Sequence, residues 1–164
     1  MKSIVPRAAF ALFLAAGSAA RAQSLQVING ATTVTLSAED IAAMPHVTVD
    51  AFDAHEKATH RYAGVLAENI LMKAGVVFGE KLRGKGLGSV VMAHAKDGYV
   101  IAFALAEFDP AFREKPIVLV DSQDGQPVVS GMGPYRLLCP GDARPARWVR
   151  MIQSLEVLPP PAAK

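Results

Sequence analysis

Short segments in which apolar and polar residues alternate, bounded by glycine-containing turns, recur along this chain and constrain its fold most strongly. The clearest pair is residues 89–95 and 99–104, on either side of Lys96-Asp97-Gly98. Successive side chains of a strand point to opposite faces, so this alternation predicts a hairpin with one buried face. Residues 25–29 and 32–36 predict a second hairpin around Asn29-Gly30.

Other segments predict further strands and two short helices. Strands are expected at residues 47–51, 117–120 and 148–158. Helical spacing of apolar residues predicts one helix after a capping box at Ser37 and a second over residues 66–74, closed by Gly75. The polar stretch 53–60 predicts a loop. There is no βαβ rhythm and no internal repeat, so the fold class is α+β, mostly β, as a sandwich or barrel-like sheet.

The first 22 residues have the order of a secretory signal peptide. Lys2 and Arg7 precede an apolar run over residues 8–16, and small residues end at Ala22. The apolar run is shorter than the roughly 20 residues that span a bilayer. We therefore expect cleavage before Gln23, a periplasmic location and no membrane insertion after cleavage. The domain boundaries expected are a signal peptide over 1–22, one domain over 23–158 and a disordered tail over 159–164.

The charge and the cysteine content exclude some classes of function. The chain has a formal net charge of +2, and its predicted signal peptide holds three basic residues and no acidic one, which leaves −1 after cleavage. Charge therefore gives no support for a nucleic-acid partner. Cys139 is the only cysteine, so no internal disulfide can form. Its apolar neighbours predict a buried thiol.

A cluster of arginines beside the only tryptophan is the strongest candidate for a binding site. Within fifteen residues the chain places four arginines around one acidic residue and Trp148: Arg136, Asp142, Arg144, Arg147 and Arg150. In one interpretation a flat heterocycle stacks on Trp148 or on an arginine, while Asp142 accepts paired N–H bonds from an amidine-like edge. In the other, Trp148 anchors the core, the arginines are solvated and Asp142 pairs with one of them.

Two further groups of residues point to other chemistry only weakly. Residues 81–88 are rich in glycine and lysine but lack the Lys-Ser/Thr pair and the following helix of a phosphate loop, so they predict a basic turn. His55 and His60, with Asp53 and Glu56 nearby, match no metal-ligand spacing, and no metal is expected. No arrangement of Ser, His and acid typical of a hydrolase can be identified.

Several phrases in order resemble the molybdopterin-binding domain of sulfite-oxidase-type oxidoreductases. They span most of residues 25–157 and comprise 36–41 (LSAEDI), 47–49 (VTV), 62–66 (YAGVL), 97–99 (DGY), 133–137 (GPYRL), 140–141 (PG) and 148–149 (WV). The resemblance implies an α+β, mostly β domain with a mixed sheet, short helices and a pterin cleft on one side.

The chain departs from that family at the metal ligand. Catalytic members coordinate molybdenum through a cysteine thiolate just after the strand that residues 47–49 resemble. This chain has Asp50, Ala51 and Phe52 there. A methyl group cannot replace a thiolate, so molybdenum redox chemistry of the family type is not expected.

A smaller group of exported relatives is similar over residues 140–150. Those proteins keep the fold, lack the cysteine and bind free pterins as sensors. The resemblance implies a non-catalytic periplasmic pterin-binding protein that signals to the periplasmic domain of an inner-membrane enzyme controlling cyclic di-GMP. Its ligand residues would be Arg136, Asp142, Arg144, Arg147 and Trp148. Two alternatives stay open: a molybdopterin-dependent oxidoreductase or its accessory subunit, and an interaction protein with a vestigial cleft.

Overall fold

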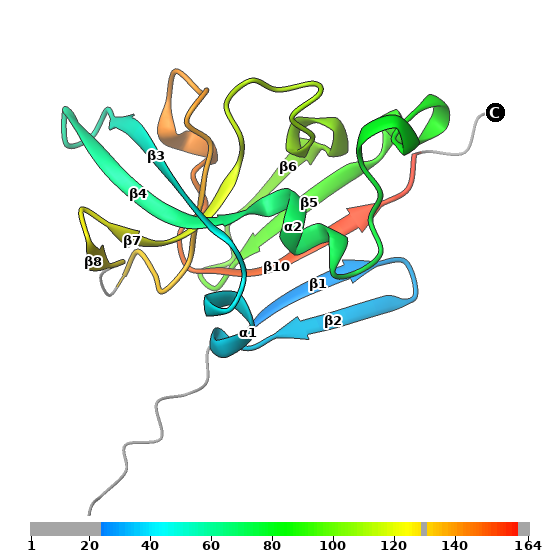
Figure 1. The fold of residues 1–164 in the computed structure, drawn as a ribbon, viewed down its shortest axis with the longest axis horizontal. Helices are drawn as coiled ribbons and strands as arrows, with labels where there is room; N and C mark the ends of the chain where they lie inside the picture. Colours follow the sequence, from blue (N-terminus) through cyan, green and yellow to red (C-terminus); the bar gives the residue numbers. More distant parts are fainter. Residues whose placement is uncertain (1–23, 129–130, 161–164) are drawn as a thin grey trace, which may run out of the picture.

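Two β-sheets and two short helices make up the part of the chain that the computed structural model describes, residues 24–128 and 131–160 (Figure 1). The predicted signal peptide and residues 161–164 of the predicted tail lie outside it. Within the described residues, no helix has the length and apolar character needed to cross a bilayer.

The first sheet is mixed and joins the two ends of the described chain. Its strand order is β2 (Thr32–Leu36), β1 (Leu25–Asn29), β10 (Ile152–Leu158), β5 (Val90–Ala95) and β6 (Val100–Ala104). β1 pairs with β10 in parallel, and the other pairs are antiparallel. Both predicted hairpins are confirmed, β1–β2 and β5–β6. The predicted last strand begins at Ile152, four residues later than expected.

The second sheet is antiparallel and corrects one prediction. It contains β3 (His46–Asp53), β4 (Ala58–Leu66), β7 (Val118–Gln123) and β8 (Gln126–Pro127), with β9 (Arg136–Leu138) on β7. The polar stretch 53–60, predicted to be a loop, is the tight turn and the flanking strand ends of the β3–β4 hairpin. The prediction was wrong because exposed and half-exposed strand positions accept polar side chains, as those of Thr59 and His60 do.

The helices form where capping residues predicted them. α1 (Ala38–Ala42) begins at a capping box in which Ser37 Oγ accepts from Asp40 N at 3.1 Å and Asp40 accepts from Ser37 N at 2.8 Å. α2 (Ala67–Met72) is followed by Gly75 with φ +77°. Four 3₁₀ turns complete the elements of the described residues: η1 (Gly79–Lys81), η2 (Gly84–Gly88), η3 (Leu105–Phe108) and η4 (Pro145–Arg147).

Apolar residues from both sheets and from α2 form one core. Its largest fully buried side chains include Tyr62, Ile70, Phe103, Leu119 and Leu155. Cys139 is buried in the same core, as predicted, and this burial raises the pKa of its thiol to about 12. The thiol therefore stays protonated and unreactive at neutral pH.

The second sheet depends on a close approach of β4 to β7 at Gly64. Gly64 pairs with Val120 beside a shift in register, and a Cβ at this position would fall on the carbonyl oxygen of Leu119 and 2.5 Å from Val120 Cα. Those are backbone atoms, which cannot move aside as a side chain can.

We predict that Gly64→Ala destabilises the protein by about 2 kcal/mol or more, because the new methyl must push β7 away from β4. The matched control is Gly86→Ala, where a Cβ would meet only the Leu82 side chain at 3.5 Å. Urea unfolding midpoints measure both. Equal midpoints for the two variants would contradict the close-approach argument.

Candidate functional site

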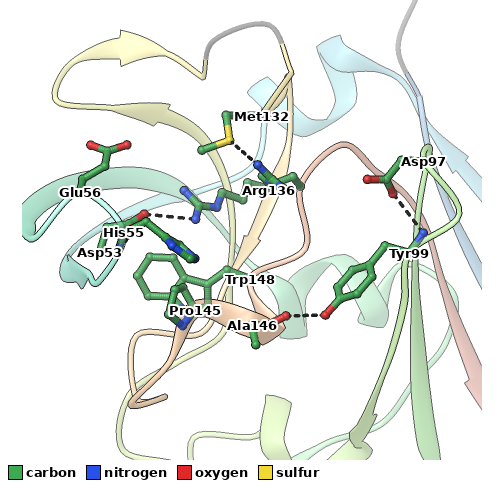
Figure 2. A pocket seen from close by; sticks show the side chains of 11 residues that line it. Asp53, His55, Glu56, Asp97, Tyr99, Met132, Arg136, Pro145, Ala146 and Trp148 are labelled. Atoms are coloured by element: carbon green, nitrogen blue, oxygen red, sulfur yellow. Dashed lines mark hydrogen bonds and ion pairs between the residues drawn. The ribbon is translucent and has the colours of Figure 1, made fainter.

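A cavity of about 470 Å³ lies between the turns of both sheets and the segment around η4 (Figure 2). The β3–β4 turn, the β5–β6 turn, the approach to β9 and the η4 segment each contribute to it. Its lining residues are Asp53, His55, Glu56, Asp97, Tyr99, Met132, Arg136, Pro145, Ala146, Trp148 and Arg150. The volume is within the range of roughly 300–1,000 Å³ typical of small-molecule sites.

A buried ion pair forms one wall of the cavity. Arg136 is 4% exposed and Asp53 2%, and the Arg136 Nη2 lies 3.4 Å from an Asp53 carboxylate oxygen. Burial opposes ionisation of Asp53. The amide of His55 and the Arg136 guanidinium outweigh it and hold the pKa of Asp53 below its usual range. Both charges thus persist in the interior, where each is stable only with its partner.

Trp148 is a fixed wall of the cavity. Its Nε1 donates to Cys139 O at 2.9 Å, Tyr62 packs edge-on at 6.2 Å between ring centroids, and the Arg136 guanidinium lies 5.0 Å from its ring centroid. Only 5% of the Trp148 surface is exposed, so the indole anchors the core, which was one of the two interpretations of the sequence. It also lines the cavity.

The more accessible aromatic ring at the cavity belongs to Tyr99, which is 45% exposed. Its hydroxyl donates to Ala146 O at 2.8 Å, and its amide donates to an Asp97 carboxylate oxygen at 3.0 Å (Figure 2). The bond to Ala146 connects the β5–β6 turn to η4, whereas the bond to Asp97 lies within the turn.

Two buried polar atoms on side chains that contact Trp148 lack partners. Among the residues that the structure describes, nothing pairs with Nε of Arg136, which lines the cavity, or with the hydroxyl of Tyr62, which does not line it. A buried polar group left unpaired costs about 1–3 kcal/mol.

The charges that line the cavity balance almost completely. Arg136 and Arg150 stand against three carboxylates, so the lining has a formal charge of −1 with His55 neutral. Such a lining favours a neutral or cationic ligand with both donors and acceptors over a strongly anionic one.

A separate ring of ion pairs holds η4 in place. Arg147 binds Asp142 through two nitrogens at 2.7 and 2.8 Å and Glu107 at 3.0 Å, while Arg113 binds Glu107 at 2.9 Å and Asp142 at 3.2 Å. Burial opposes ionisation of Asp142, but Arg147 and Arg113 outweigh it and lower the pKa of this carboxyl. The hydrogen bonds to Asp142 in turn raise the pKa of Arg147. The bidentate geometry fixes the arginine in position.

The structure separates the residues that the sequence grouped together. Arg136 and Trp148 line the cavity. Asp142 and Arg147 do not line it, because each is engaged in the ion-pair ring, and Arg144 is exposed outside it. The pterin role of these five residues stays a prediction.

Sequence reasoning did not assign the carboxylates or the tyrosine of the cavity to a binding site, and it considered Asp53, His55 and Glu56 only as metal ligands. Asp53 is 83 positions from its partner Arg136 in the chain, and no local pattern connects them. The phrase Asp97-Gly98-Tyr99 was noticed as a turn and as part of the resemblance, which was the available signal for two of these residues.

The donor set does not fit a thiolate-bound molybdenum. Ala51 is buried within β3, and Cys139 is buried with a raised thiol pKa, 3.8 Å from the carbonyl oxygen of Arg147. No group of three or more metal-ligating side chains occurs within residues 24–128 and 131–160. His60 instead contacts Asp124 at 2.6 Å and Glu56 at 2.8 Å.

The fold is α+β and mostly β, as the sequence predicted, with a mixed sheet, an antiparallel sheet and short helices, and it is similar to a sulfite-oxidase-type fold. One similar solved structure is that of the sulfane dehydrogenase SoxCD from Paracoccus pantotrophus, with a TM-score of 0.64 and 17% identity. The match covers 82% of this chain and 38% of that chain. At this identity the likeness shows the fold alone. No family model matches the chain, and no curated protein matches its sequence.

We predict that the protein is more stable at mildly acidic pH than at pH 8, through His60 and His46. Hydrogen bonds to Asp124 and Asp121 respectively raise the pKa of each imidazole. When the pKa of a histidine is higher in the folded state than in the unfolded state, the resulting stabilisation is complete at pH values below the unfolded-state pKa of about 6.5. It is lost as the pH rises through the folded-state pKa.

Thermal midpoints between pH 5.5 and 8.5 measure this dependence. The double variant His46→Gln/His60→Gln should have a flatter profile than the wild type, because glutamine does not titrate. A profile as steep as that of the wild type would show that other groups cause it.

Proposed function

We propose that the protein is a non-catalytic binder of a pterin, held in the cavity beside Arg136 and Trp148. The observation that carries the proposal is the buried Arg136, whose Nε has no partner among the described residues although the side chain lines a cavity of ligand size. A ring oxygen or nitrogen of the ligand would accept a hydrogen bond from the Arg136 guanidinium where it lines the cavity.

The cavity supplies the other contacts that a pterin needs. The amidine-like edge of a pterin presents parallel N–H donors, which suit a carboxylate. Asp97 and Glu56 both line the cavity and could accept them. The flat ring of the pterin could stack on the exposed face of Tyr99 and pack against the wall at Trp148. In this proposal Asp97 or Glu56 takes the role that the sequence suggested for Asp142, whose oxygens already bind Arg147 and Arg113.

The charge of the lining supports a free pterin over molybdopterin. Molybdopterin carries a phosphate, and a lining of formal charge −1 offers no compensation for a dianion. The missing thiolate supports the same choice. An oxidoreductase or its accessory subunit is the second candidate, favoured by the fold likeness to a sulfane dehydrogenase.

The cellular role that we propose is sensing. The predicted signal peptide and the similarity to exported pterin sensors support a periplasmic protein whose bound state is transmitted to an inner-membrane enzyme of cyclic di-GMP metabolism. The ligand would act by stabilising one arrangement of the turns that form the cavity.

We predict that neutral pterin binds and raises the thermal midpoint, by a stabilisation of about 2.7 kcal/mol at a ligand concentration 100-fold above Kd. Because Trp148 is the only tryptophan, its fluorescence reports ligand binding at the cavity directly. Asp97→Asn should weaken binding about 10-fold or more, since the amide replaces one of the two carboxylate acceptors by an NH₂ donor that faces an N–H of the ligand.

Asp142→Asn is the matched control, because it makes the same chemical change in the ion-pair ring. It should lower stability and leave pterin affinity within about 2-fold of the wild type. The proposal fails if pterin at millimolar concentration leaves both the thermal midpoint and Trp148 emission unchanged. Molybdenum retained at one equivalent by protein from a cofactor-competent host would favour the second candidate.

A further inference from the structure

The outer edge of the mixed sheet is the strand β2, and nothing in its sequence protects that edge. Its residues are Thr-Thr-Val-Thr-Leu, with no charge and no proline. Proteins usually guard a free strand edge with lysine, proline, a bulge or a covering segment, because unpaired main-chain groups there can pair with another chain. The edge strand of the other sheet, β3, by contrast, carries His46, Asp50 and Asp53.

The hairpin geometry identifies which main-chain groups of β2 face outward. Only Gly30 and Ala31 separate β1 from β2, so the pair Asn29–Thr32 next to the turn is hydrogen-bonded. In an antiparallel pair such positions alternate, so Val34 and Leu36 also bond inward to β1. The N–H and C=O groups of Thr33 and Thr35 therefore point away from the sheet.

A groove of about 850 Å³ runs along this same edge. Three consecutive residues of β2, Val34, Thr35 and Leu36, line it. Successive strand side chains point to opposite faces, so three in a row can line one groove only if it follows the edge of the strand. The groove thus lies beside the outward main-chain groups of Thr35.

The other wall of the groove is mixed. The segment after α1 contributes Ala43, Met44 and Pro45, α2 contributes Met72, and the polar residues Asp40, Asn69 and Lys73 also line it. Met72 is 53% exposed although it is a large apolar side chain. Methionine is flexible enough to pack against different partners, and it is common on peptide-binding surfaces.

We propose that the β2 edge and this groove bind an extended segment of a partner protein, which adds to the mixed sheet as a further strand. Main-chain bonds to Thr33 and Thr35 would hold the segment, and every second side chain, being apolar, would enter the groove between Leu36, Met44 and Met72. A helix cannot pair with the strand edge itself, because its own main-chain groups are already paired. The inference does not depend on the pterin cavity.

The probe for the experiment is the acetylated and amidated peptide Ser-Leu-Gln-Val-Ile-Asn-Gly, which copies residues 24–30. Its central residues form β1, so it is a sequence able to pair with β2, and its apolar residues alternate. Amide NMR spectra of the protein should show shifts at Thr33, Thr35, Met44 and Met72 as peptide is added.

Two N-methylated versions of the peptide separate strand addition from apolar contact. One is methylated at the nitrogens of Leu, Val and Asn, and the other at those of Gln and Ile. Strand addition uses the N–H groups of one edge only, so one version should lose binding at least 10-fold while the other keeps it.

The protein variant that tests the edge is Thr35→Pro, which removes an outward N–H and leaves the inward ladder intact. It should weaken binding at least 10-fold, whereas the control Thr35→Ala, which keeps the N–H, should not. Both variants should bind pterin like the wild type, so a failure of this proposal is distinguishable from a failure of the proposed function. An unchanged thermal midpoint confirms that Thr35→Pro is folded.

Three results would overturn the inference. The first is no shift at Thr33 or Thr35 with peptide at millimolar concentration. The second is equal binding of both methylated peptides. The third is a concentration-dependent dimer in light scattering that Thr35→Pro abolishes, because the occupant of the edge would then be a second copy of this chain.

Discussion

The buried pair between Arg136 and Asp53 is the interaction on which the arrangement of the site depends. Asp53 ends β3 and Arg136 begins β9, so the pair connects the β3–β4 hairpin to the segment that precedes the C-terminal strand. Arg136 also contacts the Trp148 ring, which is fixed by the carbonyl of Cys139. Removing either charge would leave the other unpaired in the interior, at a cost of about 3–5 kcal/mol. Such a pair is therefore a strong constraint on geometry.

A second set of charges positions the opposite side of the cavity. The ring of Glu107, Arg113, Asp142 and Arg147 fixes η4, and η4 presents Pro145 and Ala146 to the cavity. Because each arginine contacts both carboxylates, loss of one member weakens the whole ring. The arginine-rich sequence thus has two uses: Arg136 belongs to the cavity, while Arg147 supports it from outside.

The strands and helices could largely be predicted, because local patterns determine them. The β5–β6 hairpin follows from alternation around Lys96-Asp97-Gly98, and α1 follows from Ser37 and Asp40. The strand β3 was predicted over residues 47–51, but its partner β4 was missed because the polar residues at its start occupy exposed strand positions, where alternation in hydropathy is weak. The candidate site was predicted only in part: Arg136 and Trp148 line the cavity, but its carboxylates come from turns far away in the chain.

The sequence by itself determined the β-rich class, the burial of Cys139, and the absence of a cysteine where the similar enzymes need one, since each depends on residue type or short-range periodicity. Tertiary structure alone decided which charges meet. Electrostatic partners depend on proximity in space. Asp53 and Arg136 lie close together because the β3–β4 hairpin pairs with β7, and β7 pairs with β9. Tertiary structure alone also shows that the Nε of Arg136 is unpaired among the described residues and that the edge at Thr35 is open. A group can be identified as unpaired only when the positions of all its neighbours are known.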